Sequence, residues 1–406
     1  MFRQDVRVGP ITLLSLSLLS LNCGAPPEDE TSETPMPATP TMVPATPTLA
    51  PTEPPTPDPT EPPPTPEPTE PDDGPGPGGG DGPPGGGDGP PGGGPGDNTP
   101  KPGDTETPTQ VPAVSEVLNL PEELTFPEGL AYDGGQGYFY TGSFEDGAIY
   151  RGKAGETWEP WQAPGTDGRV SALGMVVDPP RRRLFVATVD GVQAYDLDRN
   201  LLLADFAAPA ASNGGESFLN GLARGTDGII YVSDSYQPRI LYVDPALDGL
   251  KVWTDIPGTT MTWGAGYNLN GLAILGRTDM YAVKSNDGAL WHIDLDTKVF
   301  TQVELTGSAR NLMFGDGLAL GSRGGLFVML NQPDEVAQVT LGADGLTGVI
   351  AGFADASDGL MFPSSAILNE GRLFVVNSQI DQLAAGVPPQ VPFTISAVVV
   401  PEVTTP

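Results

Sequence analysis

A short pattern recurs along the chain from residue 127 onward, and its spacing constrains the fold more than any other feature. The pattern is Gly-Leu-Ala preceded by a residue with a side-chain oxygen, and it reads PEGLA, LNGLA, LNGLA and GDGLA. Two weaker copies read ALGMVVDP and PSSAIL. The aligned positions are 129, 174, 221, 271, 317 and 365, so successive copies lie 45 to 50 residues apart. Such a repeat indicates one supersecondary unit present six times.

Each copy is followed by a turn signal and then by an alternating apolar run, as in DGGQGYFYTG, RGTDGIIYVSD and NEGRLFVVNS. Alternation without a long 3.6-residue period predicts an all-β chain. Six such units predict a six-bladed β-propeller over residues 112–402, because four-stranded blades take roughly 40–50 residues. Either 114–120 or 394–400 is expected to close the sixth blade. An open solenoid is the alternative, which is disfavoured because no distinct capping repeats are present.

The residue before each repeat glycine varies in a way that suggests a metal site. Equivalent positions of a propeller's inner strands converge on its axis, and in blade order these positions hold Glu128, Leu173, Asn220, Asn270, Asp316 and Ser364. Two carboxylates and two amides at one place suit a hard cation, with Ca²⁺ preferred over other divalent cations. Zinc is disfavoured because the set has no Cys or His. The alternative is that Asn-Gly and Asp-Gly are ordinary turn dipeptides, although Glu128-Gly129 is a poor turn pair.

These motifs resemble a known family. FPEGLAYD, NGLARGTDGIIYVSDS and GDGLAL, in this blade order, are similar to the SMP-30/gluconolactonase/luciferin-regenerating-enzyme family of calcium-dependent six-bladed propellers. The resemblance implies a metal held by Glu128, Asn220, Asn270 and Asp316, and hydrolysis of a lactone or similar ester. Asp316, and after it Glu128, would be the catalytic carboxylates that activate water. Phe218 is a departure, because sugar-lactonase members usually have Arg there.

Other catalytic arrangements are disfavoured. His292 is the sole histidine and lies in ALWHIDLD, a pattern of an outer strand, so a structural role is expected. A Ser-His-Asp triad then has no histidine available. The segments that lead into the axial positions are rich in aromatic residues, which predicts a hydrophobic substrate pocket or, alternatively, ordinary loop packing. The predicted pocket residues are Phe218, Trp263, Tyr267 and Phe314.

The N-terminal part of the chain predicts export and tethering. Residues 1–23 contain an apolar run, 11–21, that is too short to span a bilayer, followed by Cys23. This resembles a bacterial lipoprotein signal in which Cys23 is lipidated and retained, although Asn22 stands where that signal usually has a smaller residue. An ordinary secretory signal is the alternative. Residues 24–111 are rich in Pro, Thr and Gly and predict a disordered acidic linker.

The strong negative charge of the chain restricts which molecules it is expected to bind. The formal net charge of -33 repels phosphate backbones, so nucleic acid is not expected as a partner. We expect a monomeric, calcium-dependent hydrolase of a small-molecule lactone or ester. It would be lipid-anchored in the bacterial cell envelope, at the outer membrane or cell surface, and secreted if Cys23 is not lipidated. The alternative is a non-catalytic propeller that binds a ligand or protein and holds a structural calcium.

Overall fold

The computed structural model describes residues 114–401 except 257, 259, 308–310 and 322–323. The predicted signal, the lipidation site Cys23 and the predicted linker lie outside the described residues. Within the described part of the chain, none of the helices has the length and apolarity needed to cross a bilayer.

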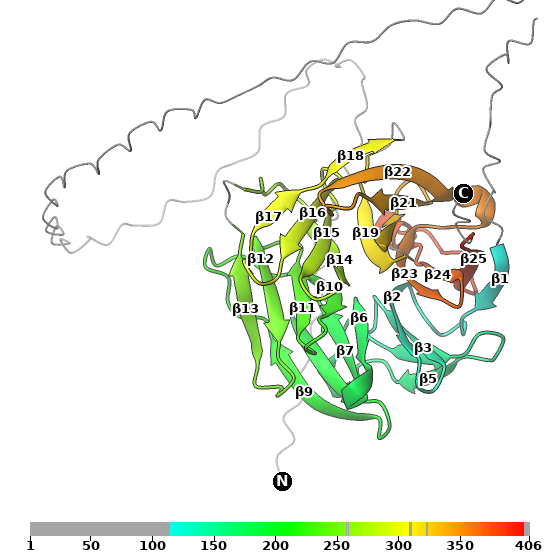
Figure 1. Cartoon of the computed structure of the whole chain (residues 1–406). Helices are drawn as coiled ribbons and strands as arrows, with labels where there is room; N and C mark the ends of the chain where they lie inside the picture. Colours follow the sequence, from blue (N-terminus) through cyan, green and yellow to red (C-terminus); the bar gives the residue numbers. More distant parts are fainter. Residues whose placement is uncertain (1–113, 257, 259, 308–310, 322–323, 402–406) are drawn as a thin grey trace, which may run out of the picture. The chain divides into compact units, whose positions relative to one another are not determined.

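Six mainly antiparallel sheets of the described residues are arranged as blades around one axis, which confirms the predicted all-β, six-bladed propeller (Figure 1). Blade one contains β2 (Pro127–Asp133), β3 (Tyr138–Ser143), β4 (Ile149–Gly152) and β5 (Glu159–Gln162). Blade two contains β6 (Met175–Asp178), β7 (Arg183–Thr188), β8 (Gly191–Asp196) and β9 (Leu201–Ala207). Blade three contains β10 (Leu219–Arg224), β11 (Ile230–Asp234), β12 (Arg239–Val243) and β13 (Leu250–Asp255).

The remaining blades follow the same order. Blade four contains β14 (Leu269–Leu275), β15 (Asp279–Lys284), β16 (Ala289–Asp294) and β17 (Phe300–Gln302). Blade five contains β19 (Gly315–Leu320), β20 (Gly325–Leu330), β21 (Glu335–Leu341) and β22 (Thr347–Ala354), and β18 (Glu304–Gly307) adds a parallel outer strand beside β22. Where the chain is described, the short helices are η1 (Thr166–Gly168), η2 (Pro179–Arg181), η4 (Ala356–Asp358) and α1 (Ile380–Ala385).

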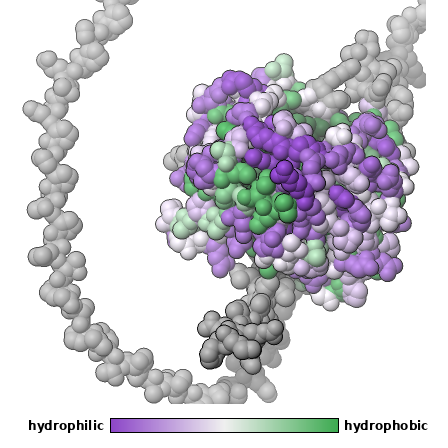
Figure 2. All heavy atoms as spheres, turned by 90° about the horizontal axis from the view of Figure 1, so that it is seen from below, coloured by the Kyte–Doolittle hydropathy of each residue, from purple (hydrophilic) through white to green (hydrophobic). Residues whose placement is uncertain are grey.

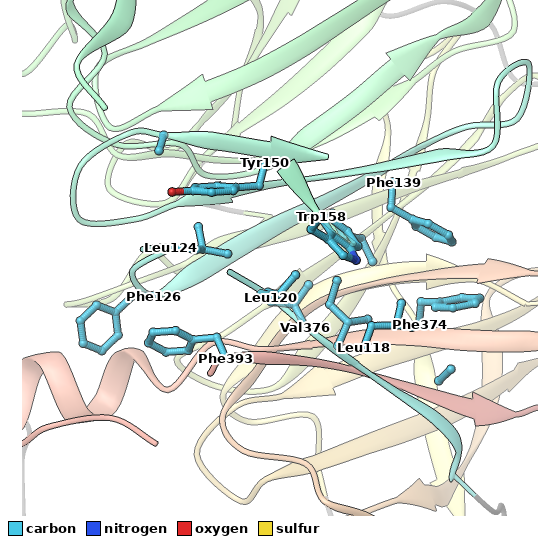
Figure 3. Packing of buried hydrophobic residues seen from close by; sticks show 14 residues of the cluster. Leu118, Leu120, Leu124, Phe126, Phe139, Tyr150, Trp158, Phe374, Val376 and Phe393 are labelled. Atoms are coloured by element: carbon cyan, nitrogen blue, oxygen red, sulfur yellow. The ribbon is translucent and has the colours of Figure 1, made fainter. Parts of the chain in front are cut away.

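The sixth blade is closed by strands from both ends of the domain. It contains β23 (Pro363–Asn369), β24 (Arg372–Asn377), β25 (Thr394–Val399) and, outermost, β1 (Val114–Asn119). The two candidate closing segments are therefore both used, with β25 as the third strand and β1 as the fourth. Leu118 and Leu120 pack at the junction of blades six and one, where the rings of Phe139 and Phe374 lie 4.6 Å apart (Figure 3). Burial of this apolar cluster stabilises the closed ring.

Hydrophilic residues cover most of the surface seen in Figure 2, and hydrophobic residues gather in a patch on that face. In the interior, the buried apolar side chains form six clusters of the described residues. These clusters join neighbouring blades face to face, as sheet packing in a propeller requires.

The repeat glycines permit neighbouring inner strands to approach closely at the axis. A Cβ on Gly129 would lie 2.1 Å from the Leu173 carbonyl oxygen, and one on Gly174 would lie 2.2 Å from the Asn220 oxygen. Gly221, Gly271 and Gly317 meet the carbonyl oxygen of the next blade in the same way, at 2.4, 2.4 and 2.6 Å. Real Cβ atoms do not come this close to a backbone oxygen. The repeat therefore requires glycine because of contact between blades.

Gly174→Ala tests this contact without altering a predicted metal ligand. We expect it to lower the free energy of unfolding by about 1–3 kcal/mol, because the added methyl group overlaps the Asn220 carbonyl. Thermal unfolding gives the measurement, with about 2–4 °C expected for each kcal/mol. Gly352→Ala in β22 is the matched control, because a Cβ there meets no atom within 4 Å. An equal loss of stability in both variants would contradict the proposed contact.

Candidate metal centre on the propeller axis

A β-bulge places the axial residue in five of the six inner strands. In blade three Leu219 pairs with Asp234 and Leu222 with Val232, so Asn220 and Gly221 together oppose Ser233 alone. The inner strands of blades one, four, five and six show the same irregularity at the equivalent place. A bulge redirects a side chain out of the regular alternation of a strand. The repeated bulge therefore turns these side chains toward the axis.

The structure brings the four predicted ligands together. Glu128, Asn220, Asn270 and Asp316 all line one cavity on the axis, and all four are buried. Ser364 lines the same cavity, and its hydroxyl donates to the Glu128 carbonyl at 2.8 Å. Leu173 is buried in an apolar cluster instead. The six axial positions thus divide as the sequence suggested, into four with strong oxygen donors and two without.

The two axial carboxylates differ from the other buried acids of the described residues in their partners. Asp133, Asp178 and Asp234 are also buried, but each pairs with arginine: Arg182 at 2.6 Å, Arg224 at 2.7 Å and Arg239 at 3.1 Å, respectively. Among the described residues, neither Glu128 nor Asp316 forms an ion pair with Lys or Arg. Two adjacent buried carboxylates without a cation are costly. Among the described residues, these two carboxylates thus lack the basic partner that each of the other buried acids has.

The pKa values of both groups reflect this environment. Burial raises the pKa of Glu128 well above its usual range, and the negative charge of Asp316 raises it further. Burial also raises the pKa of Asp316, to about 7, while hydrogen bonds from the Asn331 and Asn270 side chains act in the opposite direction. The cause in each case is loss of water around a charged form.

The donor set fits a hard cation. The Oε2 atom of Glu128 is buried and has no hydrogen-bond partner among the described residues. No cluster of three or more His, Cys, Asp or Glu occurs in the described part of the chain, so the set consists of two carboxylates supplemented by amide oxygens. Oxygen ligands of this mixed charge suit Ca²⁺ and leave coordination positions for water or substrate.

The cavity has a volume of about 400 Å³ and is lined by all six inner strands. It begins at the axial side chains and continues along the residues that follow them, for example Leu130 and Tyr132 of β2 and Leu318 and Leu320 of β19. It therefore has a polar end, at the carboxylates, and an apolar wall. This is the form expected of a small-molecule site.

The four residues predicted to form a substrate pocket do not line this cavity. They belong to the loops that precede the inner strands, on the opposite side of the axial side chains. Phe218 and Tyr267 pack edge to face at 5.0 Å. Burial raises the pKa of Tyr267, and Tyr236 and the negative charge of Asp316 raise it further. The Trp263 indole N–H donates to the Tyr236 carbonyl at 3.1 Å, and Phe314 is 43% exposed.

His292 lies apart from this site. Its Nε2 is 2.8 Å from Asp279 Oδ1, and its ring contacts Tyr281 edge to face at 5.3 Å. Both partners are in β15, the strand beside the β16 strand that carries His292. These contacts agree with the structural role expected from the sequence.

Two residues of the site were not predicted from the sequence. Tyr236 contacts Phe218 and Tyr267 at 5.2 and 5.4 Å, which completes an aromatic cluster. The Asn331 amide donates to Asp316 Oδ2 at 3.3 Å. Asn331 follows Asp316 by fifteen positions, and its relation to that carboxylate depends on strand register, which the repeat alone does not reveal.

The fold is similar to solved propellers at low sequence identity. The major allergen Mala s 1 of Malassezia sympodialis is 14% identical with a TM-score of 0.53, over 70% of this chain and 96% of that one. A proposed gluconolactonase is 14% identical with a TM-score of 0.51, over 71% and 93%. A gluconolactonase of Xanthomonas campestris is 14% identical with a TM-score of 0.50, over 72% and 95%. No family model matches the sequence, and no curated protein matches it either.

These similarities define the class of protein by its fold. The chain is a six-bladed propeller whose structural neighbours include gluconolactonases. A sequence identity of 14% to these structures establishes that the folds are alike, and it does not establish a shared activity.

Asp316→Asn tests whether the axial carboxylates oppose each other when no cation is bound. We expect this variant to raise the melting temperature in the presence of a chelator at pH 8, because it removes one of two adjacent desolvated charges while keeping the side-chain shape. Differential scanning calorimetry gives the measurement, at about 2–4 °C for each kcal/mol. Asp205→Asn in β9 removes an exposed carboxylate and serves as the control. A lower melting temperature for Asp316→Asn would show that the carboxylate is already compensated.

Proposed function

We propose that the chain is a calcium-dependent hydrolase that acts on a lactone or similar ester at the propeller axis. The observation that carries the proposal is the pair of buried carboxylates that have no arginine or lysine partner within the described part of the chain, grouped with two amides around one cavity. The unpartnered Oε2 of Glu128 supports it independently. The gluconolactonases among the structural neighbours are in agreement with this proposal, at the level of the fold.

Glu128, Asn220, Asn270 and Asp316 would hold the ion. Bound Ca²⁺ would supply positive charge that polarises an ester carbonyl and favours the oxyanion that develops from it. Asp316 is the residue proposed to accept a proton from water, because its environment favours the protonated form more than an exposed aspartate would. Glu128 is the second candidate for this role. Tyr267 keeps its proton because burial raises its pKa, so its hydroxyl can act as a hydrogen-bond donor.

The aromatic loop residues do not line the axial cavity, and they are proposed to select an apolar substrate group that approaches the axial side chains from the loop side. Phe218, Tyr236 and Tyr267 form one cluster on the loop side of the ring, and Phe314 lies exposed two residues before Asp316. Aromatic faces of this kind favour a planar or apolar group over a sugar. The substrate class proposed is therefore an aryl or alkyl ester, or an apolar lactone.

A second function is kept because of two observations. Phe218 stands where sugar-lactonase members usually have Arg, and His292 lies apart from the cavity as a partner of Asp279. A base independent of the metal ligands is therefore not found among the described residues that line the cavity. On this alternative the chain is a ligand- or protein-binding propeller in which calcium ties the inner strands together.

The location of the protein is proposed from the sequence alone. We propose lipidation at Cys23, attachment to the membrane of the bacterial cell envelope and an extended linker that carries a monomeric domain. Nucleic acid is not proposed as a partner, because the chain carries a net charge of -33.

Calcium dependence is tested by binding, thermal stability and turnover together. We expect the purified protein to bind Ca²⁺ by calorimetry, to melt at a higher temperature with it, and to turn over members of a panel of lactones and aryl esters only in its presence. Asp316→Ala is expected to lose both binding and turnover, while Asp205→Ala, an exposed carboxylate of β9, keeps them. Binding with stabilisation but without turnover of any substrate would favour the binding-propeller alternative. Absence of calcium binding by the unaltered protein would contradict both functions.

Phe218→Ala tests the proposed preference for apolar substrates. We expect kcat/KM for an aryl ester to fall roughly tenfold, because the substitution removes one face of the aromatic cluster. Calcium affinity should stay unchanged, since the Phe218 side chain lacks an oxygen ligand. An equal fall for a polar sugar lactone would contradict selection by aromatic contact.

A further inference from the structure

The amide groups of Asn220 and Asn270 are held in one orientation by hydroxyl groups behind them. Asn220 Nδ2 lies 3.3 Å from Ser235 Oγ, and Asn270 Nδ2 lies 3.3 Å from Ser285 Oγ. Both serines follow the second strand of their blade, fifteen positions after the amide that they contact. The same arrangement therefore occurs in two neighbouring blades.

The serine hydrogens are already committed elsewhere. Ser235 Oγ donates to the Leu269 carbonyl at 2.6 Å, and Ser285 Oγ donates to the Gly315 carbonyl at 2.6 Å. A carbonyl can only accept, so each serine has used its single hydrogen and can only accept from the asparagine. The asparagine must then present its NH₂ group to serine. Its Oδ1 atom is not used by the serine and is available to a cation, which requires oxygen, while the NH₂ group of Asn270 also interacts with the Asp316 carboxylate.

The same contacts link one blade to the next. Leu269 immediately precedes Asn270, and Gly315 immediately precedes Asp316, so each serine also fixes the backbone beside the next axial residue. In blade five, Asn331 stands at the equivalent position and donates to Asp316 Oδ2. Glu128 has no such partner, since Phe144 occupies the corresponding place in blade one and Oε2 is unpartnered among the described residues.

We propose that Ser235, Ser285 and Asn331 are positioning residues that join Asn220, Asn270 and Asp316 into one rigid arc, with Glu128 as the separate, adaptable ligand. This inference rests on the proposed calcium site. It assigns a role to three residues that do not themselves line the cavity. Their contribution is to keep the amide oxygens directed at the cation, which reduces the ordering needed when it binds.

Calcium affinity of the full-length protein, measured by titration calorimetry, tests the arc. Ser235→Ala and Ser285→Ala are expected to weaken Ca²⁺ binding about 10–100-fold, as loss of the group that orients a ligand does. Ser233→Ala is the matched control and should change affinity less than threefold. Ser233 is equally buried and donates to the Asn270 carbonyl at 2.6 Å, but no hydrogen bond connects it to an axial side chain. Melting temperatures without calcium should fall similarly in the serine variants at 233 and 235.

A double variant tests whether Ser235 affects calcium affinity through the Asn220 side chain. If Ser235 acts through Asn220, then Ser235→Ala added to Asn220→Ala should weaken calcium binding no further than Asn220→Ala alone. Equal affinities of Ser233→Ala, Ser235→Ala and Ser285→Ala would overturn the arc while leaving the calcium site in place. Additive losses in the double variant would also overturn it. A wild-type protein that binds no calcium would overturn the proposed function and the arc together.

Discussion

The close approach of neighbouring inner strands at the axis is the constraint on which the other features depend. The carbonyl oxygen of one blade occupies the place where a Cβ of the preceding blade would be, at 2.1 to 2.6 Å in five of the six junctions of the described propeller. This contact fixes the glycine and, with it, the position of the residue before glycine. The contact does not restrict the side chain of that preceding residue, which therefore differs from blade to blade. A constant glycine and a variable oxygen are therefore two consequences of one packing contact.

The convergence of the inner strands at the axis also brings the two axial carboxylates close enough for the charge of Asp316 to raise the pKa of Glu128. Five acidic residues of the described chain are buried, and the three outside the axis are neutralised by arginines of their own or the next blade. None of the six axial positions carries an arginine or lysine. Among the described residues, Asp316 has only the amides of Asn331 and Asn270 as side-chain hydrogen-bond partners, and Glu128 Oε2 has none. Repulsion between these two carboxylates is unfavourable when no ion is bound, and a small cation between them would relieve it.

The repeat was sufficient to predict the propeller and the members of the axial set, because both follow from sequence positions that are local to each copy. Features that depend on register between strands were not predictable in this way. The bulge at Asn220-Gly221 appears only when β10 is paired with β11. The closing strand was ambiguous because β25 and β1 share one sheet. Likewise, the aromatic loops could be identified, but their position on the side of the ring opposite the cavity required the three-dimensional structure.

The hydrogen-bond partners of the axial side chains differ between the neutral amides and the charged carboxylates. An asparagine side chain presents either an oxygen or an NH₂ group, so it needs a neighbour that can only accept, and a serine whose hydrogen is bound to a carbonyl meets this need. A carboxylate has oxygen on both sides and needs no such choice. Asp316 accordingly has a donor, Asn331, and Glu128 has no partner among the described residues. In both blades with amides a serine follows the second strand, fifteen residues after the axial asparagine. The separation alone does not identify such a serine, because Ser143 also lies fifteen residues after Glu128 but belongs to the second strand itself. The role of the serine therefore depends on strand register as well as on spacing.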